Sequence, residues 1–509
     1  MSDGTTDNAL TVPAWLRDLS SRHGPNPAIC AEDSSLTYAE LDSASRALAR
    51  GLLARGVGKG TRVGLLFGNG TDWVTWWAAV TRIGALCIPL STFLRPAELA
   101  RVVRHSDLHL LVAQKSFLNR DFAQVIGDAF PDLTSMSPEL ALAEAPFLRS
   151  VVLDEPGRQW ARDMAWVVDA GRDAPWERIL DNAESEVHPD DEALCIYTSG
   201  QSAEPKGAVF SQRAILTKAG YFAAMFGFTT ATETNVTLPF FWVGGLVMSL
   251  FPTMAAGGVT RCTQRSTWGS NTAIIGKPPP GSVKPALPPG IKSVPSLGMT
   301  ETFGMYAWGT EFPSEPYPIA APLDEFQPGF VVRLVDEHGA DVADGVPGEI
   351  LVRGPTLATR LNKVLRTQVF DEAGFYRTGD LVVRHEGRMR FVGRMGDMIK
   401  TSGANVSPPE VERELEALEG IEAAHVVGLA DDRRGQLVAA AVVRADGATI
   451  TDGEINQLLR ERLSPYKVPK VIVFLSSRDE VPLTASTKVS KRDLAELIKD
   501  RWASTPDDG

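Results

Sequence analysis

The sequence predicts an α/β protein: a large N-terminal domain of mostly parallel sheets flanked by helices, followed by a small α+β C-terminal domain. Three observations predict this. The chain has 509 residues, which is more than a single hydrophobic core usually serves. Helical patterns alternate with short apolar runs through the first 120 residues. From residue 411 onward the order changes to helix, strand, strand, helix, strand.

The N-terminal elements follow one another closely. Residues 36–55 carry apolar side chains at helical spacing, and residues 62–67 form a short apolar run typical of a buried strand. Residues 71–84 form an amphipathic, Trp-rich helix, and residues 85–89 are again strand-like. Helices that alternate with buried strands predict a mostly parallel sheet.

The middle of the chain holds one long uncharged stretch, residues 236–260. It is long enough to span a bilayer, but Pro239, Pro252 and four glycines interrupt it, so a buried strand-helix segment is the better interpretation and no integral membrane segment is expected. Residues 278–290 are rich in Pro and Gly and predict a loop. Residues 329–353 alternate strand and turn.

The C-terminal elements are predicted as a compact unit of about 110 residues, which is the size of a domain. They are helix 411–418, strand 423–429, strand 437–444, helix 452–463 and strand 471–474.

Composition excludes several classes of protein. With 44% hydrophobic and 22% charged residues the chain is not disordered, and a net charge of −12 without a basic cluster argues against nucleic acid as a partner. The four cysteines have no metal-ligand spacing and predict buried free thiols in a reducing compartment. The acidic N-terminus lacks the features of a signal peptide, so we expect a cytoplasmic protein.

The segment from Tyr197 to Gly207, YTSGQSAEPKG, follows an apolar run and forms a loop that leaves a strand. Small hydroxylated residues and glycines let backbone N–H groups close around phosphate oxygens, and a lysine adds positive charge. The segment does not match the P-loop consensus. From its residues alone, a phosphate loop and an ordinary polar turn both stay open.

Seven segments, in order, resemble the motifs of the adenylate-forming superfamily (acyl-CoA synthetases, luciferases and adenylation domains). They are YTSGQSAEPKG (197–207), LPFFWVGG (238–245), GMTET (298–302), GEILVRGP (348–355), YRTGD (376–380), a GRxxDxIKxxGxNVxPxE-like run (393–410) and PLTASTKVSK (482–491). The resemblance implies an AMP-forming acid–thiol ligase that uses ATP, Mg²⁺ and coenzyme A. It also implies fatty acid metabolism as one process in which such an enzyme acts. The products would be acyl-CoA, AMP and pyrophosphate.

The resemblance also implies the nucleotide site. Glu301 would hold Mg²⁺, Thr300 would bond the α-phosphate, and Leu297 would lie on the adenine. Asp380 can only accept hydrogen bonds, which suits the ribose hydroxyls, and Arg394 would bond the ribose as well. The loop residues expected at the phosphates are Thr198, Ser199, Gly200, Gln201, Ser202, Lys206 and Gly207.

In the superfamily the C-terminal domain is mobile and alternates between two half-reactions. The resemblance places the domains at 1–395 and 396–509, with Gly396 as the hinge and Asp397 as the next candidate. Lys488 would act during adenylation, whereas Lys400 and Gly403 would reach the site for thioester formation. Glycine suits a hinge because it tolerates large changes in φ and ψ.

The substrate pocket is expected at Phe240, Phe241, Trp242 and Gly244. This segment has no acidic residue to pair with an ammonium group, so an amino acid is not expected as the substrate. An apolar wall selects by size and hydrophobicity, which leaves fatty, alicyclic and aryl acids open.

Departures from the motifs support two alternatives. Gln201, Ala203 and Leu297 replace the usual residues, and the segment 259–297 is shorter than the resemblance predicts. The chain could therefore be a degenerate homologue that binds nucleotide or acyl ligand with little or no turnover. The second alternative is a stand-alone adenylation enzyme that loads a carrier protein. The sequence leaves the identity of the acid and the oligomeric state open, with a homodimer as one option.

Overall fold

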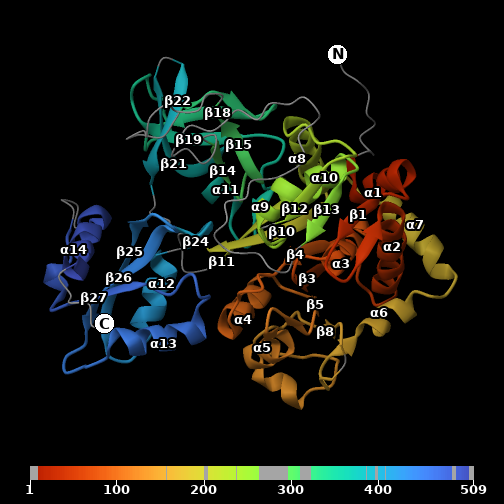
Figure 1. Ribbon diagram of the computed structural model, residues 1–509, viewed down its shortest axis with the longest axis horizontal. Coiled ribbons are helices and arrows are strands. Elements are labelled where there is room, and N and C mark those ends of the chain that lie inside the picture. Colours follow the sequence, from red (N-terminus) through yellow and green to blue (C-terminus); the bar gives the residue numbers. More distant parts are fainter. Residues whose placement is uncertain are drawn as a thin grey trace. The chain divides into compact units, whose positions relative to one another are not determined.

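A computed structural model describes residues 10–155, 157–199, 205–236, 238–262, 296–309, 322–385, 387–395, 399–406, 408–483 and 489–503 (Figure 1). The chain divides into two compact units. Unit 1 contains Met1–Thr92, Val103–Tyr197 and Gly207–Gly393. Unit 2 contains Phe93–Val102, Thr198–Lys206 and Arg394–Gly509. The boundary at Gly393 lies close to the predicted domain boundary after residue 395, which stays a prediction.

An eight-stranded sheet forms the centre of unit 1, in the order β20-β11-β10-β4-β3-β5-β8-β9. The pairs β10–β4, β4–β3, β3–β5, β5–β8 and β8–β9 are parallel, and β11 pairs with β20 antiparallel. The strands are β3 Arg62–Leu66, β4 Leu86–Pro89, β5 Leu110–Ala113, β8 Ser150–Leu153, β9 Arg162–Asp163, β10 Glu192–Ser199, β11 Pro205–Ser211 and β20 Arg360–Leu361.

A second sheet of unit 1 has the order β12-β13-β1-β2. Its strands are β1 Pro27–Cys30, β2 Ser35–Thr37, β12 Glu233–Val236 and β13 Val259–Cys262. Between β12 and β13 lie the short helix α9 (Val243–Gly245), a π-helical turn (Leu246–Leu250) and helix α10 (Phe251–Ala255), and most of this stretch is buried. The predicted strand-helix segment is therefore confirmed. In the part of the chain that the structure describes, no helix has the length and apolarity needed to cross a membrane.

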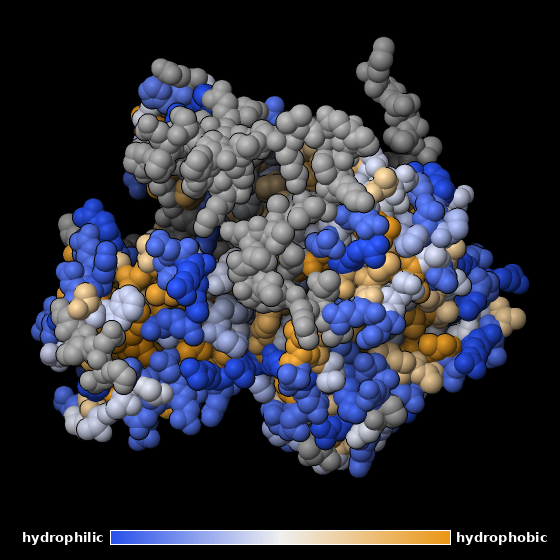
Figure 2. Space-filling view, in the orientation of Figure 1, coloured by the Kyte–Doolittle hydropathy of each residue, from blue (hydrophilic) through white to orange (hydrophobic). Residues whose placement is uncertain are grey.

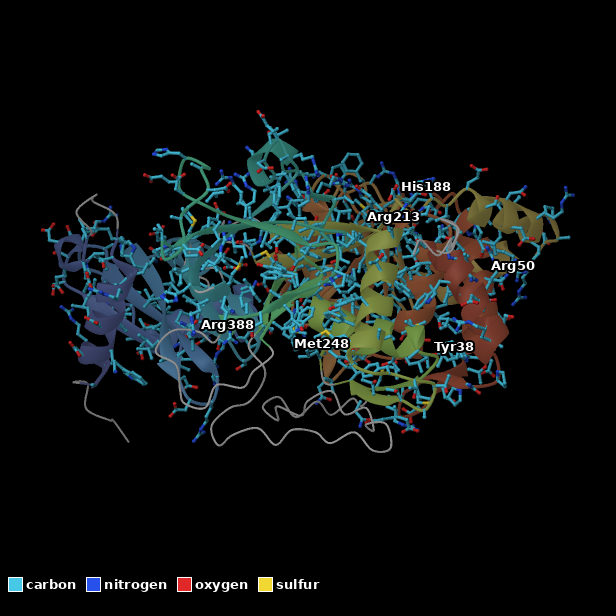
Figure 3. The ribbon with its side chains drawn as sticks, turned by 90° about the horizontal axis from the view of Figure 1, so that it is seen from above. Tyr38, Arg50, His188, Arg213, Met248 and Arg388 are labelled. Carbon is cyan, nitrogen blue, oxygen red and sulfur yellow. The ribbon has the colours of Figure 1, made fainter. Side chains whose placement is uncertain are left out.

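Helices pack around these sheets, among them α1 (Val12–His23), α2 (Tyr38–Ala54), α3 (Thr71–Arg82), α7 (Pro175–Ser185) and α8 (Gln212–Met225). Figure 1 shows α1, α2 and α3 side by side, and α2 contacts both of the others. Helix α2 begins at a capping box, in which Thr37 and Glu40 satisfy each other's backbone N–H groups. The Tyr38 hydroxyl, labelled in Figure 3, donates to the Gly258 carbonyl at 2.7 Å and ties α2 to the start of β13.

Buried charges join α2, α3 and α7. The Arg82 guanidinium is fully buried, lies 3.2 Å from Glu184 and donates to the Asp42 carboxylate at 2.5 Å. Glu184 is also fully buried at its carboxylate and pairs with Arg46 and Arg17. At the exposed rim, Arg50 of α2 pairs with Glu177 of α7, and Figure 3 labels this arginine. Because Arg17 lies on α1, this network holds four helices in one arrangement against the sheet.

Unit 1 also contains two larger antiparallel sheets. One has the order β14-β15-β17 and the other β16-β22-β21-β19-β18. The strands are β14 Ser296–Met299, β15 Gly304–Trp308, β16 Pro322–Leu323, β17 Glu325–Phe326, β18 Val331–Val335, β19 Gly348–Arg353, β21 Tyr376–His385 and β22 Arg388–Arg394. Both sheets contribute to one apolar cluster that includes Leu297, Tyr306, Ile350 and Tyr376.

Unit 2 is an α+β layer built on the sheet β24-β23-β26-β25, with β27 parallel to β26. Side chains of β26 alternate between two apolar clusters, one shared with α12 and α13 and the other with α14. The elements are β23 Ile399–Thr401, β24 Ala404–Val406, α12 Pro408–Glu416, β25 Ile421–Asp431, β26 Gly435–Arg444, α13 Asp452–Arg462, β27 Val471–Leu475 and α14 Lys491–Ala503. Helices α12 and α13 thus cover one face of the sheet and α14 covers the other.

One lysine is buried inside unit 2 between two carboxylates. The Lys467 amine lies 2.9 Å from both Glu98 and Glu410, and the Ser464 hydroxyl donates to Glu98 at 2.8 Å. Burial by itself would lower the pKa of Lys467, but the two carboxylates, Glu98 first, outweigh it and the pKa is raised. The lysine is therefore charged at neutral pH.

The periodic patterns predicted these elements well. The helices and strands expected in the first 90 residues correspond to α2, β3, α3 and β4, and those expected after residue 410 correspond to α12, β25, β26, α13 and β27. Three of the four free cysteines are buried as expected, whereas Cys30 is partly exposed. The predicted loop at 278–290 lies outside the described residues. The extensive antiparallel pairing of β14–β22 in unit 1 was not predicted from the sequence.

We predict that Glu184→Gln destabilises unit 1, because it leaves the Arg82 guanidinium buried with one partner fewer. Removing one member of a buried ion pair costs about 3 kcal/mol or more. Thermal unfolding followed by circular dichroism measures the effect. Glu186→Gln is the matched control, since Glu186 follows the same helix and is exposed. Equal midpoints for the two variants would contradict the role given to this network.

Candidate functional site

The predicted phosphate loop connects two adjacent strands of the large sheet. Strand β10 ends at Ser199 and β11 begins at Pro205. Thr198 and Lys206, at the two sides of the loop, are both partly exposed. Residues 200–204, which include the predicted Gly200, Gln201 and Ser202, lie outside the described residues, and Ser199 is described by its backbone alone. A strand end next to a polar turn is a common place for a ligand in an open α/β sheet.

Strand β20 fixes β10 and β11 from the side. Arg360 makes two hydrogen bonds, at 2.6 and 2.7 Å, with the carboxylate of Glu192, the first residue of β10. On β11, the backbone of Val209 accepts from the Thr359 amide at 2.8 Å, and Gly207 accepts from the Asn362 amide at 2.7 Å. Charge-assisted bonds therefore hold the start of β10, and backbone bonds hold β11 directly after the loop.

Thr300 and Glu301 lie on the tight turn between β14 and β15. Thr302 stabilises this turn, because its hydroxyl accepts from the Met299 amide at 3.1 Å and lies 2.6 Å from the Gly304 carbonyl. The Glu301 carbonyl accepts from the Ala358 amide at 2.8 Å. Its carboxylate is partly exposed and makes no hydrogen bond or ion pair within the described part of the chain.

The Glu301 carboxylate suits a hard cation. Mg²⁺ is usually bound by one or two carboxylates together with substrate phosphates, rather than by a cage of protein ligands. Among the described residues, no group of three or more His, Cys, Asp or Glu side chains could hold a metal ion. A single oxygen ligand at this turn therefore fits Mg²⁺ that arrives with a nucleotide.

Leu297, the predicted neighbour of the adenine, is on β14 and is 9% exposed. Its side chain packs in the apolar cluster of the antiparallel sheets, beside Tyr306 and Ala307. The neighbouring Ser296 and Gly298 point to the exposed side of the strand. The contact of Leu297 with adenine stays a prediction.

A buried lysine of α8 anchors the strand that pairs with β14. The Lys218 amine donates to the Met305 carbonyl of β15 at 2.7 Å and to the Gln327 side chain at 2.5 Å. Burial lowers the pKa of Lys218 to about 7, so the amine loses its charge near neutral pH. Both partners accept hydrogen bonds from the charged and the neutral amine alike, and the turn at Thr300 thus has a fixed support behind it.

Asp380 lies on β21 and is 1% exposed. Its backbone N–H donates to the Thr378 hydroxyl at 3.0 Å, and that hydroxyl donates to the Ile350 carbonyl at 2.6 Å. The Glu349 carboxylate of β19 accepts from the Gly379 amide at 3.0 Å and from Arg377 at 2.8 Å. Two sequence motifs, GEILVRGP and YRTGD, are thereby joined side by side.

The predicted acid-pocket segment is more buried than expected of a pocket wall. Phe240 is fully buried and packs against Trp73 with ring centroids 5.1 Å apart, and Phe241 is 4% exposed. Trp242 and Gly244 are partly exposed. Figure 3 labels Met248, which lies on the π-helical turn that follows and is also partly exposed. Met248 was not among the pocket residues predicted from the sequence.

Unit 2 carries Lys400 and Gly403 on one hairpin. Lys400 is an exposed residue of β23, and its backbone N–H donates to the Gln436 side chain at 2.7 Å. Gly403 has φ +80° in the turn between β23 and β24, a conformation that strongly favours glycine. Arg394, the last residue of β22, is described by its backbone alone, and Gly396, Asp397 and Lys488 lie outside the described residues.

Sequence reasoning missed four polar residues that support the predicted site: His105, Lys218, Glu349 and Asn362. Glu349 was part of a recognised motif but had no assigned role. His105 and Asn362 are far from the loop in sequence, and both contact Tyr197, the residue before the loop. His105 ends helix α4 (Pro96–His105) and Asn362 follows β20, so only the tertiary fold brings them to Tyr197, and their local sequence carried no signal.

Two family models match the chain. The model described as AMP-binding enzyme matches residues 16–276, and the AMP-binding enzyme C-terminal domain matches residues 410–488. The first match covers about half of the chain and ends within the segment that the sequence analysis described as shortened. The two matches together include the predicted phosphate loop and most of unit 2.

The chain is also similar to known proteins over nearly its whole length. It is 30% identical to an indoleacetate–CoA ligase of Aromatoleum aromaticum, over 96% of this chain and 98% of that protein. It is 28% identical to a feruloyl-CoA synthase of Amycolatopsis sp, over 90% and 93% of the two chains. A solved structure of a double mutant of o-succinylbenzoate CoA synthetase from Bacillus subtilis matches with a TM-score of 0.71 and 22% identity, over 95% and 98% of the chains. The chain belongs to the AMP-binding enzyme family, the adenylate-forming superfamily.

Proposed function

We propose that this protein activates an apolar, aromatic carboxylic acid with ATP as its acyl-adenylate, and transfers the acyl group to coenzyme A. The observation that supports this best is the extent of the match to the indoleacetate–CoA ligase, which includes both family domains. A relative that shared only the nucleotide-binding part would support ATP use and leave the acceptor open.

Three properties support an aromatic acid. The curated relatives named above act on indoleacetate and ferulate by their names. The segment 238–248 of this chain contains no acidic or basic side chain that could pair with a charged substrate tail. Its partly exposed members include Trp242 and Met248, which suit a flat apolar ring because aromatic and thioether groups pack well against π-faces.

The chemistry explains why the site needs fixed charges. A carboxylate oxygen attacks the α-phosphorus of ATP, pyrophosphate leaves, and two anions must approach each other. We assign Lys206 and the backbone N–H groups of the loop to the phosphates, Thr300 to the α-phosphate and Asp380 with Arg394 to the ribose. Glu301 would hold Mg²⁺, which neutralises charge on the phosphate oxygens.

The second step requires a different set of groups. The sulfur of coenzyme A attacks the carbonyl carbon of the acyl-adenylate, the thiol proton is lost, and AMP leaves with the oxygen that joined it to the acyl group. We assign this step to Lys400 and the Gly403 turn, and the first step to Lys488. An exchange of these groups at the site requires unit 2 to turn about Gly396 or Asp397, where a glycine permits two backbone conformations.

The proposed function predicts the products of a simple incubation. With ATP, Mg²⁺ and coenzyme A, indoleacetate or a related aryl acid should give equal amounts of AMP and acyl-CoA, measured by chromatography and mass spectrometry. Long-chain fatty acids and aromatic amino acids complete the panel. Product only from fatty acids would contradict the aromatic assignment, and no AMP from any acid would favour the degenerate homologue.

We predict that Lys488→Ala lowers adenylate formation by about 10²–10³-fold, because one positively charged donor at the developing charge is lost. Pyrophosphate exchange into ATP measures this step. Release of acyl-CoA from a supplied acyl-adenylate should stay near the wild-type rate. The control is Lys499→Ala, which removes an exposed lysine of α14. Equal losses in both half-reactions would contradict the role given to Lys488.

A further inference from the structure

Both ends of the predicted phosphate loop contact one buried asparagine. Asn362 follows β20 and is 3% exposed. Its backbone N–H donates to the Gly207 carbonyl, directly after the loop, at 2.7 Å. Its side-chain amide donates to the Tyr197 hydroxyl, directly before the loop, at 3.0 Å, and to the His105 carbonyl at 2.8 Å. One residue therefore joins the two ends of the segment 198–206.

The hydroxyl of Tyr197 connects Asn362 to the imidazole of His105. An amide nitrogen can only donate, so the Tyr197 oxygen accepts from Asn362 and its own hydrogen can be donated elsewhere. The Nδ1 atom of His105 lies 3.0 Å from that oxygen. The Tyr197 hydroxyl therefore has two hydrogen-bond partners, the Asn362 amide and the His105 imidazole. Burial raises the pKa of Tyr197, which keeps the hydroxyl protonated and able to donate.

The ring of Tyr197 also lies against the other end of the loop. A Cβ atom placed on Gly207 would come within 2.8 Å of the Tyr197 ring and of the Cys195 sulfur. The ring of His105 meets the Tyr197 ring edge to face, with centroids 5.7 Å apart. The residue before the loop is therefore fixed by packing on one side and by two hydrogen bonds at its hydroxyl.

These contacts add little to the pairing of strands β10 and β11, which is secured by other bonds. Strand β10 is already paired with β4, and the Arg360–Glu192 pair holds its first residue. Strand β11 is paired with β20 at Ala208 and Val209. The contacts of His105 and Asn362 act at the last residue before the loop and the first residue after it, where they restrain the loop ends more than the sheet.

We propose that His105 and Asn362 are positioning residues for the phosphate loop: they act through Tyr197 and Gly207 to hold its two ends in the arrangement that receives the phosphates of ATP. The inference rests on the proposed function, in which this loop binds ATP. Binding residues whose flanking backbone is already fixed pay a lower entropic cost when a ligand binds. Neither residue touches the nucleotide in this account.

The test is the affinity for ATP with Mg²⁺, measured by isothermal titration calorimetry on the full chain without any acid. Tyr197→Phe deletes one oxygen and should weaken ATP binding about three- to tenfold, as expected for the loss of the two hydrogen bonds at that hydroxyl. His105→Leu should have a similar effect. His105→Gln, whose amide oxygen can still accept from Tyr197, should retain most of the affinity.

Lys363→Ala is the matched control. Lys363 follows Asn362, is exposed, and pairs with Asp107 at 2.7 Å without contacting Tyr197. This variant should bind ATP like the wild type. In turnover, Tyr197→Phe and His105→Leu should raise the KM for ATP and leave the KM values for the acid and coenzyme A unchanged. Their thermal unfolding midpoints should stay close to that of the control.

Wild-type affinity for ATP in both Tyr197→Phe and His105→Leu would overturn the inference and leave the proposed function intact. An equal rise in the KM values of all three substrates, with a lower unfolding midpoint, would overturn it too, because it would show a structural role only. If the wild-type protein itself failed to bind ATP, the proposed function would fall first and the inference with it.

Discussion

The candidate site on the large sheet depends on one constraint, which is the attachment of strand β20. This strand pairs with β11 and also forms an ion pair with β10. Arg360 holds the start of β10 through Glu192, and the backbone around Thr359 and Asn362 holds β11. A loop that binds phosphate through its own N–H groups can be short and polar only if neighbouring strands supply its rigidity. Here the strand that follows the loop is held by a segment about 150 residues further along the chain.

The same principle applies to the antiparallel sheets. Glu349 of β19 accepts from Gly379 and Arg377 of β21, and so sets the backbone that presents Asp380. Lys218 fixes β15 from behind, and β15 in turn sets the turn that carries Glu301. In each case a buried polar side chain outside the predicted site positions the strand that carries it. Figure 2 shows hydrophilic residues over most of the described surface in that view, which fits the net charge of −12.

Local sequence was sufficient to predict the helices and strands, but it was insufficient to predict the residues that hold the candidate site in place. Helix α2 buries one face, whereas helix α3 and strand β26 are buried at most of their positions, and both kinds of apolar pattern are visible in the sequence. The motifs around Glu301 and Asp380 were recognisable because each is contiguous. His105, Asn362 and Lys218 act through tertiary contacts across tens to hundreds of residues, and no local pattern reports such contacts. The predicted pocket segment shows another limit of local sequence, because the full burial of Phe240 in the core could not be seen there, and its place in the acid pocket stays a prediction.

The central claim of this account is that the acid passes through an acyl-adenylate, and the fate of one oxygen atom tests it most directly. The acid carboxylate is labelled with the heavy oxygen isotope and turned over with ATP and coenzyme A. Attack by that carboxylate on the α-phosphorus predicts that AMP leaves with one labelled oxygen, detected by mass spectrometry, while pyrophosphate carries none. Unlabelled AMP, or label found in inorganic phosphate alongside ADP, would contradict the claim.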